Sequence, residues 1–189
     1  MTDDRSPALT RRGLLAVFAA TAVAAAPTYS QAFSILRGAG DIRRIRMYSG
    51  RTGESLDTIY WLEGEYIPEA LKEINYFMRD WRQDSQARID PRTIDIASAA
   101  NRMMDTSEPY MLLSGYRTAK TNALLRESSR GVARNSLHIK GMAADVRMKS
   151  RSVNQIFKAV KACGAGGVGK YSRSDFVHMD SGPIRTWGA

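Results

Sequence analysis

The chain contains only two histidines, and the first is followed by an aspartate seven residues later, in the stretch SLHIKGMAAD at positions 136–145. On a continuous helix these seven residues would rise about 10 Å, too far for His138 and Asp145 to reach one small ligand. Gly141 favours a break between them. We therefore expect a loop at His138 and a strand over 143–148, with Asp145 on its polar face.

The second histidine lies in a similar setting, in the stretch SDFVHMD at positions 174–180. On a strand, Val177 and Met179 would face the core, and Phe176, His178 and Asp180 would point the other way. If this strand neighbours the strand over 143–148, His138, Asp145 and His178 share one face. Two imidazoles and a carboxylate suit Zn²⁺ and leave a fourth position for water, as in catalytic zinc sites.

A second interpretation of these residues stays open at this point. Each histidine taken alone can be an ordinary, partly buried polar residue, and Asp145 can be a solvated surface carboxylate. Spacing alone does not decide between this interpretation and a metal site.

The remaining pattern predicts an α+β domain, one compact unit with a central antiparallel sheet flanked by helices. Strands are predicted at 42–48, as an edge strand, and at 58–62, 110–114, 143–148 and 175–180. Helices are predicted after Pro68 with Trp81 in the apolar stripe, after Pro91, from Thr118 as its cap, and over 152–162. The stretch CGAGGVGKYS at 163–172 is predicted to be a glycine-rich turn.

The first 32 residues have the composition of an export signal. Arg11 and Arg12 precede an apolar, alanine-rich run over 14–26, which resembles a twin-arginine signal. Small residues at 30–32 predict that the mature domain starts near Phe33 and extends to 189, although an uncleaved anchor is the alternative. The formal charge is +9, and about +8 of it stays on residues 33–189. Such a basic domain favours anionic polymers of the cell envelope as partners.

Two classes of function are disfavoured by composition. Cys163 is the only cysteine, so the chain has no internal disulfide framework and no cysteine-based zinc site. The basic residues are scattered, and nothing resembles a recognition helix or an aromatic RNA-binding platform. We therefore expect no nucleic-acid partner. We also expect no stable membrane span once the signal is removed.

Several motifs resemble one enzyme family. SLHIKGMAAD fits the S-x-H-x-x-G-x-A-x-D pattern of the zinc D-Ala-D-Ala peptidases, which have the Hedgehog/VanX-type fold, and SDFVHMD fits their later strand. LSGYRT, TGESL and GGVGKYSRSDFVHMDSGPIRTW resemble the MepK-like branch of periplasmic murein endopeptidases. The similarity covers residues 41–187.

This resemblance implies a role for each matching residue. His138, Asp145 and His178 correspond to the zinc ligands, and Asp175 to the general base that takes a proton from water. Arg117 corresponds to the basic residue that holds a substrate carboxylate or the developing oxyanion. Asp175 and His178 are an odd number of residues apart, so we expect Asp175 in the turn before the strand; Asp180, on the face of His178, is the rival base.

The function implied is that of a periplasmic, zinc-dependent murein endopeptidase that hydrolyses peptide cross-links between the stem peptides of peptidoglycan. Two alternatives are kept. One is a D,D- or L,D-carboxypeptidase or dipeptidase that trims stem peptides, and the other is a non-catalytic, zinc-containing module that binds the wall.

Overall fold

The computed structural model describes residues 40–129 and 131–188. They form one sheet of eight strands in the order β3-β2-β1-β4-β5-β7-β6-β8, with four α-helices and two short 3-10 helices. The strands are β1 (Ile42–Tyr48), β2 (Ser55–Leu62), β3 (Glu65–Tyr66), β4 (Tyr110–Ser114), β5 (Ala143–Arg147), β6 (Gly167–Tyr171), β7 (Phe176–Asp180) and β8 (Arg185–Trp187). The helices are α2 (Pro68–Phe77), α3 (Pro91–Met103), α4 (Ala119–Ser128), α5 (Val153–Ala162), η1 (Leu137–Lys140) and η2 (Ser172–Ser174).

The α+β class is confirmed, but the prediction of an antiparallel sheet is wrong. The sheet is mixed, because β1 pairs with β4 in parallel and β6 pairs with β8 in parallel. The first parallel pair joins strands that are not consecutive, because the chain runs from β1 through β2, β3, α2 and α3 before it returns as β4. The other five strand pairs are antiparallel.

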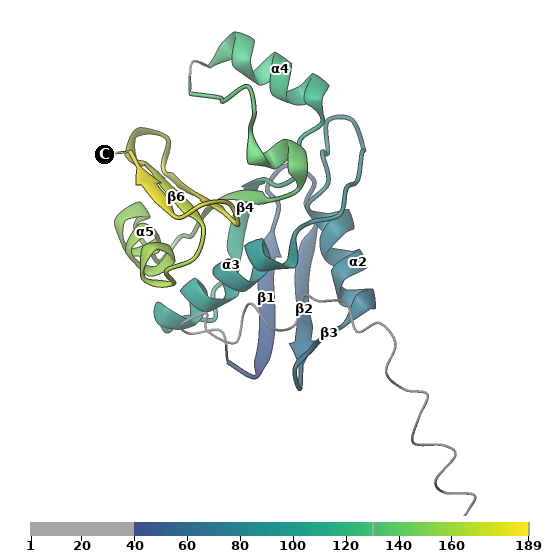
Figure 1. Ribbon diagram of the computed structural model, residues 1–189, viewed down its shortest axis with the longest axis vertical. Helices are drawn as coiled ribbons and strands as arrows, with labels where there is room; N and C mark the ends of the chain where they lie inside the picture. The colour runs from purple at the N-terminus through teal and green to yellow at the C-terminus, as the bar shows by residue number, and fades with distance from the viewer. Residues whose placement is uncertain (1–39, 130, 189) are drawn as a thin grey trace, which may run out of the picture. The chain divides into compact units, whose positions relative to one another are not determined.

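Helices α2, α3 and α5 pack against one face of the sheet and form the main core with it (Figure 1). Alternation along the strands decides which residues join this core. On β5, Ala144 and Val146 are fully buried in it, so Asp145 between them points to the opposite face. That opposite face is the one available for a site.

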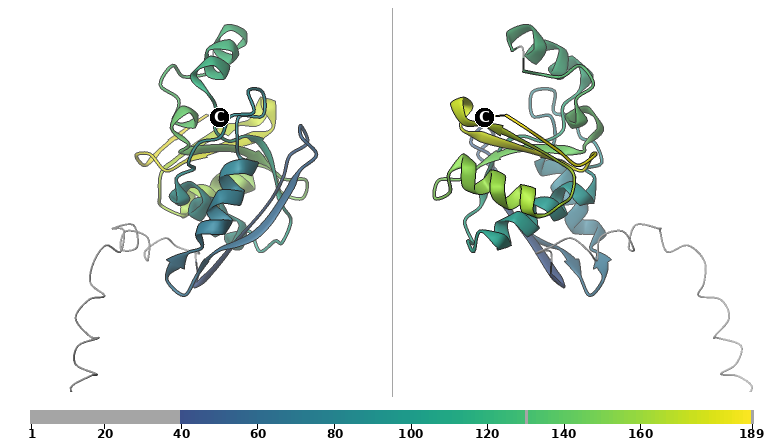
Figure 2. Two further views of the ribbon diagram at one scale, coloured as in Figure 1. Left: turned by 90° about the vertical axis from the view of Figure 1, so that its right-hand side faces the viewer. Right: turned by 60° about the vertical axis from the view of Figure 1, so that its left-hand side comes forward.

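Helix α4 projects beyond the end of the sheet, and the two further views agree (Figure 2). Thr118 caps it as predicted, because its hydroxyl accepts a hydrogen bond from the Thr121 N–H at 3.1 Å. The buried Asp80 accepts hydrogen bonds from both the N–H and the hydroxyl of Thr118. The start of α4 is therefore tied to the turn that follows α2.

Three local predictions are corrected. Strand β1 is not an edge strand, since it lies between β2 and β4; basic and apolar residues alternate from Arg44 to Met47 because one face there is buried and the other is more exposed. Trp81 lies outside α2 and is 38% exposed, because the chain leaves the helix at Met78 and turns between Asp80 and Ser85. The glycine-rich stretch after Cys163 contains a strand, β6, as well as a turn.

Within the described ranges, no helix has the length and apolarity needed to cross a membrane. The export signal predicted for residues 1–32 lies outside the described residues.

Candidate metal centre

Strands β5 and β7 bring two of the predicted ligands together. They pair antiparallel with Asp145 directly opposite His178, which meets the condition that the sequence left open, namely that these strands are neighbours. Both side chains lie on the face away from α3 and α5, and they are only 6% and 9% exposed. The sheet itself therefore fixes the distance between this carboxylate and this imidazole.

The third ligand comes from the turn before β5. The Ser136 hydroxyl caps η1 by accepting a hydrogen bond from the His138 N–H, and Gly141 ends it in the left-handed conformation, with φ 66°. A Cβ at Gly141 would lie 2.3 Å from the carbonyl oxygen of Arg88, so the chain can turn closely here only with glycine. This turn folds His138 back over Asp145, as the spacing predicted.

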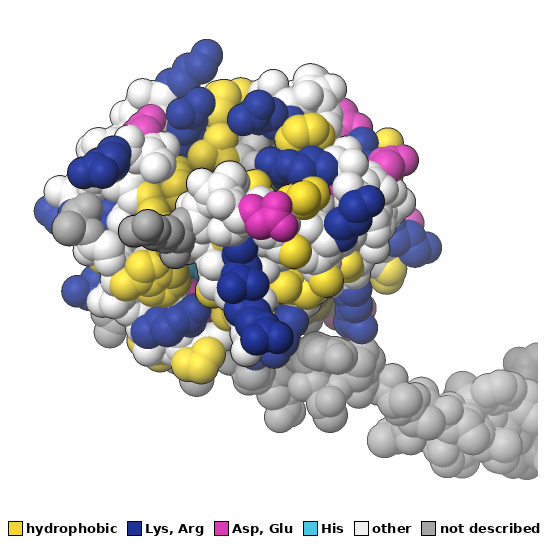
Figure 3. Space-filling view, turned by 90° about the horizontal axis from the view of Figure 1, so that it is seen from above, with side chains coloured by type: hydrophobic (Ala, Val, Ile, Leu, Met, Phe, Trp, Pro, Cys, Tyr) yellow, Lys and Arg dark blue, Asp and Glu magenta, His cyan; other side chains and the backbone are white. Residues whose placement is uncertain are grey.

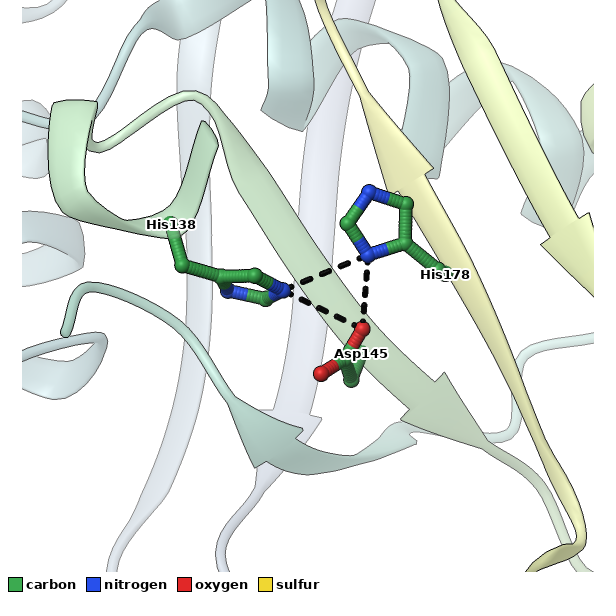
Figure 4. A group of neighbouring side chains, drawn as sticks. All are labelled: His138, Asp145 and His178. Carbon is green, nitrogen blue, oxygen red and sulfur yellow. Dashed lines mark hydrogen bonds and ion pairs between the residues drawn. The ribbon is translucent and has the colours of Figure 1, made fainter. Parts of the chain in front are cut away.

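The three side chains converge on one point (Figure 4). His138 Nε2 lies 3.2 Å from both His178 Nδ1 and Asp145 Oδ1, and the last two atoms are 2.8 Å apart. In a tetrahedral zinc site two ligand atoms are separated by about 3.3 Å. The triangle thus has the size that a first-row metal ion needs, with a fourth direction left for another ligand.

A hydrogen bond on the far side of each imidazole fixes its tautomer. His138 Nδ1 lies 2.6 Å from the Gly115 carbonyl, and His178 Nε2 lies 3.0 Å from Asp180 Oδ2. Both oxygens can only accept, so these nitrogens carry the protons and the other two nitrogens face the centre of the triangle. Such outer partners are the usual support of histidine ligands.

Arg117 lies beside the triangle, where it contacts one of the ligands. Its Nη2 donates to Asp145 Oδ2, its Nε donates to Ser114 Oγ at 2.6 Å, and its backbone N–H donates to the His138 carbonyl at 3.1 Å. The guanidinium is buried and also lines the cavity above the site. Arg117 therefore orients Asp145, a role that the motif did not reveal.

The charges of the site follow from these contacts. Burial alone would lower the pKa of His178, but its contacts with Asp145 and Asp180 raise that pKa to about 9. Burial prevails at His138 and lowers its pKa. Burial would raise the pKa of Asp145, yet the two histidines hold it well below its usual value. Without a metal at neutral pH, the site contains a carboxylate, one imidazolium and one neutral imidazole.

The two candidate bases lie in different places. Asp175 lies in the turn before β7, as the odd spacing to His178 predicted, and its backbone is left-handed, with φ 52°. Its side chain is 67% exposed, pairs with Arg147 at 3.8 Å and is not part of the triangle, although Ser174 and Phe176 on either side of it line the cavity. Asp180 is fully buried behind His178.

A cavity of about 390 Å³ opens above the triangle. His138, Asp145 and His178 line it together with Arg117, Ser129 and most residues from Gly131 to Leu137. The opposite wall is aromatic: Tyr171 and Phe176 stack at 4.4 Å, and Trp187 Nε1 donates to the Tyr171 hydroxyl at 3.0 Å.

Three side chains that converge beneath an open cavity, with room for a further ligand, are typical of metal-dependent hydrolases. The sequence identifies the class of hydrolase. Residues 37–187 match the M15 peptidase family described as Peptidoglycan L,D-endopeptidase MepK, and the chain belongs to this family.

Named relatives agree with the family match. The Peptidoglycan L,D-endopeptidase MepK of Escherichia coli (strain K12) is 40% identical over 177 residues, which cover 94% of this chain and 96% of that protein. The protein of the same name in Shigella flexneri matches equally well. The Probable peptidoglycan L,D-endopeptidase MepK of Haemophilus influenzae is 37% identical over 137 residues, 72% of this chain and 74% of that protein. The resemblance inferred from the motifs is thereby confirmed.

Proposed function

We propose that this protein is a zinc-dependent peptidoglycan L,D-endopeptidase that hydrolyses cross-links between stem peptides. The observation that carries the proposal is the triangle of His138, Asp145 and His178 at the floor of an open cavity. Membership of the peptidase family supports the reaction, and the names of the relatives support the substrate and the type of bond.

The donor set supports zinc as the metal. Two imidazole nitrogens and one carboxylate oxygen, each oriented by an outer hydrogen bond, suit Zn²⁺ better than Mg²⁺ or Ca²⁺, which prefer oxygen ligands. Zinc in such a site supplies a Lewis acid that polarises a carbonyl and makes water acidic near pH 7.

We assign the proton transfer to Asp175. It takes a proton from the attacking water and returns it to the leaving amine. Its exposed ion pair with Arg147 is weak and easily broken, so its side chain is able to turn toward the cavity that its neighbours line. Asp180 is unsuited to this role, because its oxygens already accept bonds from His178 and Arg185.

We assign Arg117 two tasks. It holds the outer oxygen of Asp145, and the remaining donors of its five-donor guanidinium bind a carboxylate of the stem peptide or the developing oxyanion. Stem peptides carry free carboxylates, so a buried cation beside the metal suits them.

Digestion of purified muropeptides tests the proposal. The metal-loaded protein is incubated with dimers joined either by an L,D or by a D,D cross-link, and the products are separated by mass. Conversion of L,D-linked dimers to monomers is the expected result. Loss of a terminal residue from monomers would instead establish a carboxypeptidase, and binding to sacculi without released fragments would establish a wall-binding module.

The affinity for zinc is expected to increase with pH by about tenfold per unit between pH 7 and 9. The raised pKa of His178, about 9, means that a metal binding at Nδ1 must displace a proton throughout this range. Above pH 9 this dependence ends. Competition with a chelator of known affinity, at several pH values, measures it, and an affinity that is constant from pH 7 to 9 would contradict the protonation assigned to His178.

We also propose that the protein is exported to the periplasm by the twin-arginine signal in residues 1–32. Arg11 and Arg12 and the apolar run after them support this proposal. The surface seen from the α4 side carries many lysine and arginine side chains and few acidic ones (Figure 3). A charge of about +8 on the exported domain favours its retention on the anionic cell wall.

A further inference from the structure

Strands β7, β6 and β8 align residues in two rows that run across the sheet. In the first row Asp180 pairs with Gly167, which pairs with Arg185. In the second row His178 pairs with Gly169, which pairs with Trp187. Each row therefore begins at the metal centre, passes a glycine and ends at a large side chain of β8.

The glycines of β6 let the side chains of β8 cross over that strand. A Cβ at Gly167 would lie 2.3 Å from Arg185 Nη1 and 2.6 Å from Asp180 Oδ2. A Cβ at Gly169 would lie 2.4 Å from the indole ring of Trp187. Contacts this close do not occur, so a side chain at either position would force the side chains of Arg185, Asp180 or Trp187 to shift.

The Arg185 guanidinium makes a bidentate salt bridge with the carboxylate of Asp180. Nη1 donates to Oδ1 at 3.0 Å and Nη2 donates to Oδ2 at 2.7 Å. Oδ1 also accepts from the backbone N–H groups of Gly167 and Gly182. Asp180 is fully buried, and these four bonds leave its carboxylate a single orientation.

In that orientation the same carboxylate holds the metal ligand. Asp180 Oδ2 accepts from His178 Nε2 at 3.0 Å, on the side of the ring opposite the metal-facing Nδ1. The ring of Trp187 lies against the imidazole, with 5.2 Å between ring centres. Strand β8 thus restrains His178 through one charged and one aromatic contact.

We propose that Arg185 is a positioning residue of the metal centre. It acts through Asp180 to fix the tautomer and orientation of the His178 ring, and thereby sets the affinity for the metal. The inference rests on the proposed function, since it requires that His138, Asp145 and His178 bind zinc. It adds strand β8 to the elements that build the site.

The test measures the apparent dissociation constant for Zn²⁺ by chelator competition at one pH, in wild type, Arg185→Gln, Asp180→Asn and the double variant. Loss of an outer partner of a metal ligand typically weakens metal binding by about 10-fold to 100-fold. We expect such a loss for Asp180→Asn and about tenfold for Arg185→Gln. Because both act along one path, the double variant should bind no more weakly than Asp180→Asn alone.

Two further variants separate positioning from charge and from folding. Arg173→Gln removes the same charge from an exposed site in η2 and should leave zinc affinity unchanged. Arg185→Lys should bind zinc more tightly than Arg185→Gln but less tightly than wild type, because it keeps the charge and loses the second hydrogen bond to Asp180. The visible absorption of the Co²⁺-loaded protein reports coordination geometry, and it should change in Arg185→Gln but not in Arg173→Gln.

Several results would overturn the proposal. If Arg185→Gln binds zinc as tightly as wild type, Arg185 does not act through Asp180. The same conclusion follows if the effects of Arg185→Gln and Asp180→Asn on zinc affinity simply add in the double variant. If Arg185→Gln fails to fold, Arg185→Lys carries the test alone, and zinc affinity equal to wild type in that variant would overturn the proposal. A wild type that binds no zinc would overturn the proposed function itself, which distinguishes the two failures.

Discussion

Replacing either histidine by alanine is expected to remove the metal and to reduce hydrolysis of cross-linked muropeptides by about 1000-fold or more. His138 and His178 supply two of the three ligand atoms, and two remaining ligands do not hold zinc at the low concentrations of an assay. The metal contributes several kcal/mol of transition-state stabilisation, which corresponds to about this factor in rate. Metal content by mass spectrometry and turnover are measured on the same samples.

The controls make this result specific to the site. Wild type should contain about one zinc ion per chain, as expected for a single three-ligand centre. Asn135→Ala trims a polar side chain of the cavity lining without touching a ligand atom, and it should keep its metal. Far-UV circular dichroism confirms that the histidine variants stay folded. Full zinc content in His138→Ala or His178→Ala would contradict the centre described above.

Asp175→Asn is expected to keep the metal but to lower kcat by about 100-fold to 10,000-fold, the usual contribution of a general base. Asparagine is chosen because it tolerates the left-handed backbone that Asp175 adopts, so the substitution removes the base and little else. Turnover of cross-linked dimers and zinc content are the two readouts.

Asp84 offers a matched control for this substitution. It also has a left-handed backbone, φ 44°, it is 83% exposed, and it pairs with an arginine, Arg79, at 2.9 Å. It does not line the cavity. Asp84→Asn should therefore leave kcat unchanged. If Asp175→Asn is as active as Asp84→Asn, the proton transfer belongs to another group.

Much of the metal centre was predictable because its determinants are local. The glycine at 141 breaks the stretch after His138, and strict alternation places Asp145 and His178 on the polar faces of their strands. What the sequence does not contain is the partner of each strand. The direct pairing of Asp145 with His178 and the parallel pairing of β1 with β4 are long-range contacts, which local patterns cannot specify.

The errors have the same physical origin. The stretch after Cys163 was predicted to be only a turn, because glycine is unfavourable in strands; the structure uses Gly167 and Gly169 in β6 because side chains of another strand pass over them. Glycines at alternate positions beside a predicted strand were the signal that could have revealed this crossing. Likewise, Arg117 finds its partner Asp145 28 residues away, at a distance that no motif encodes.

The hydrogen bond from the Arg117 N–H to the His138 carbonyl joins the two ends of the chain segment that contains α4. Both ends of this segment are anchored at the ligands, and the part that returns from α4 lines the cavity with Val132, Ala133 and Asn135 among others. Insertions, deletions and substitutions there change the cavity without moving a ligand atom, because lengthening a loop with a closed base costs little free energy. Evolution can therefore retune substrate choice in this segment independently of the chemistry beneath it.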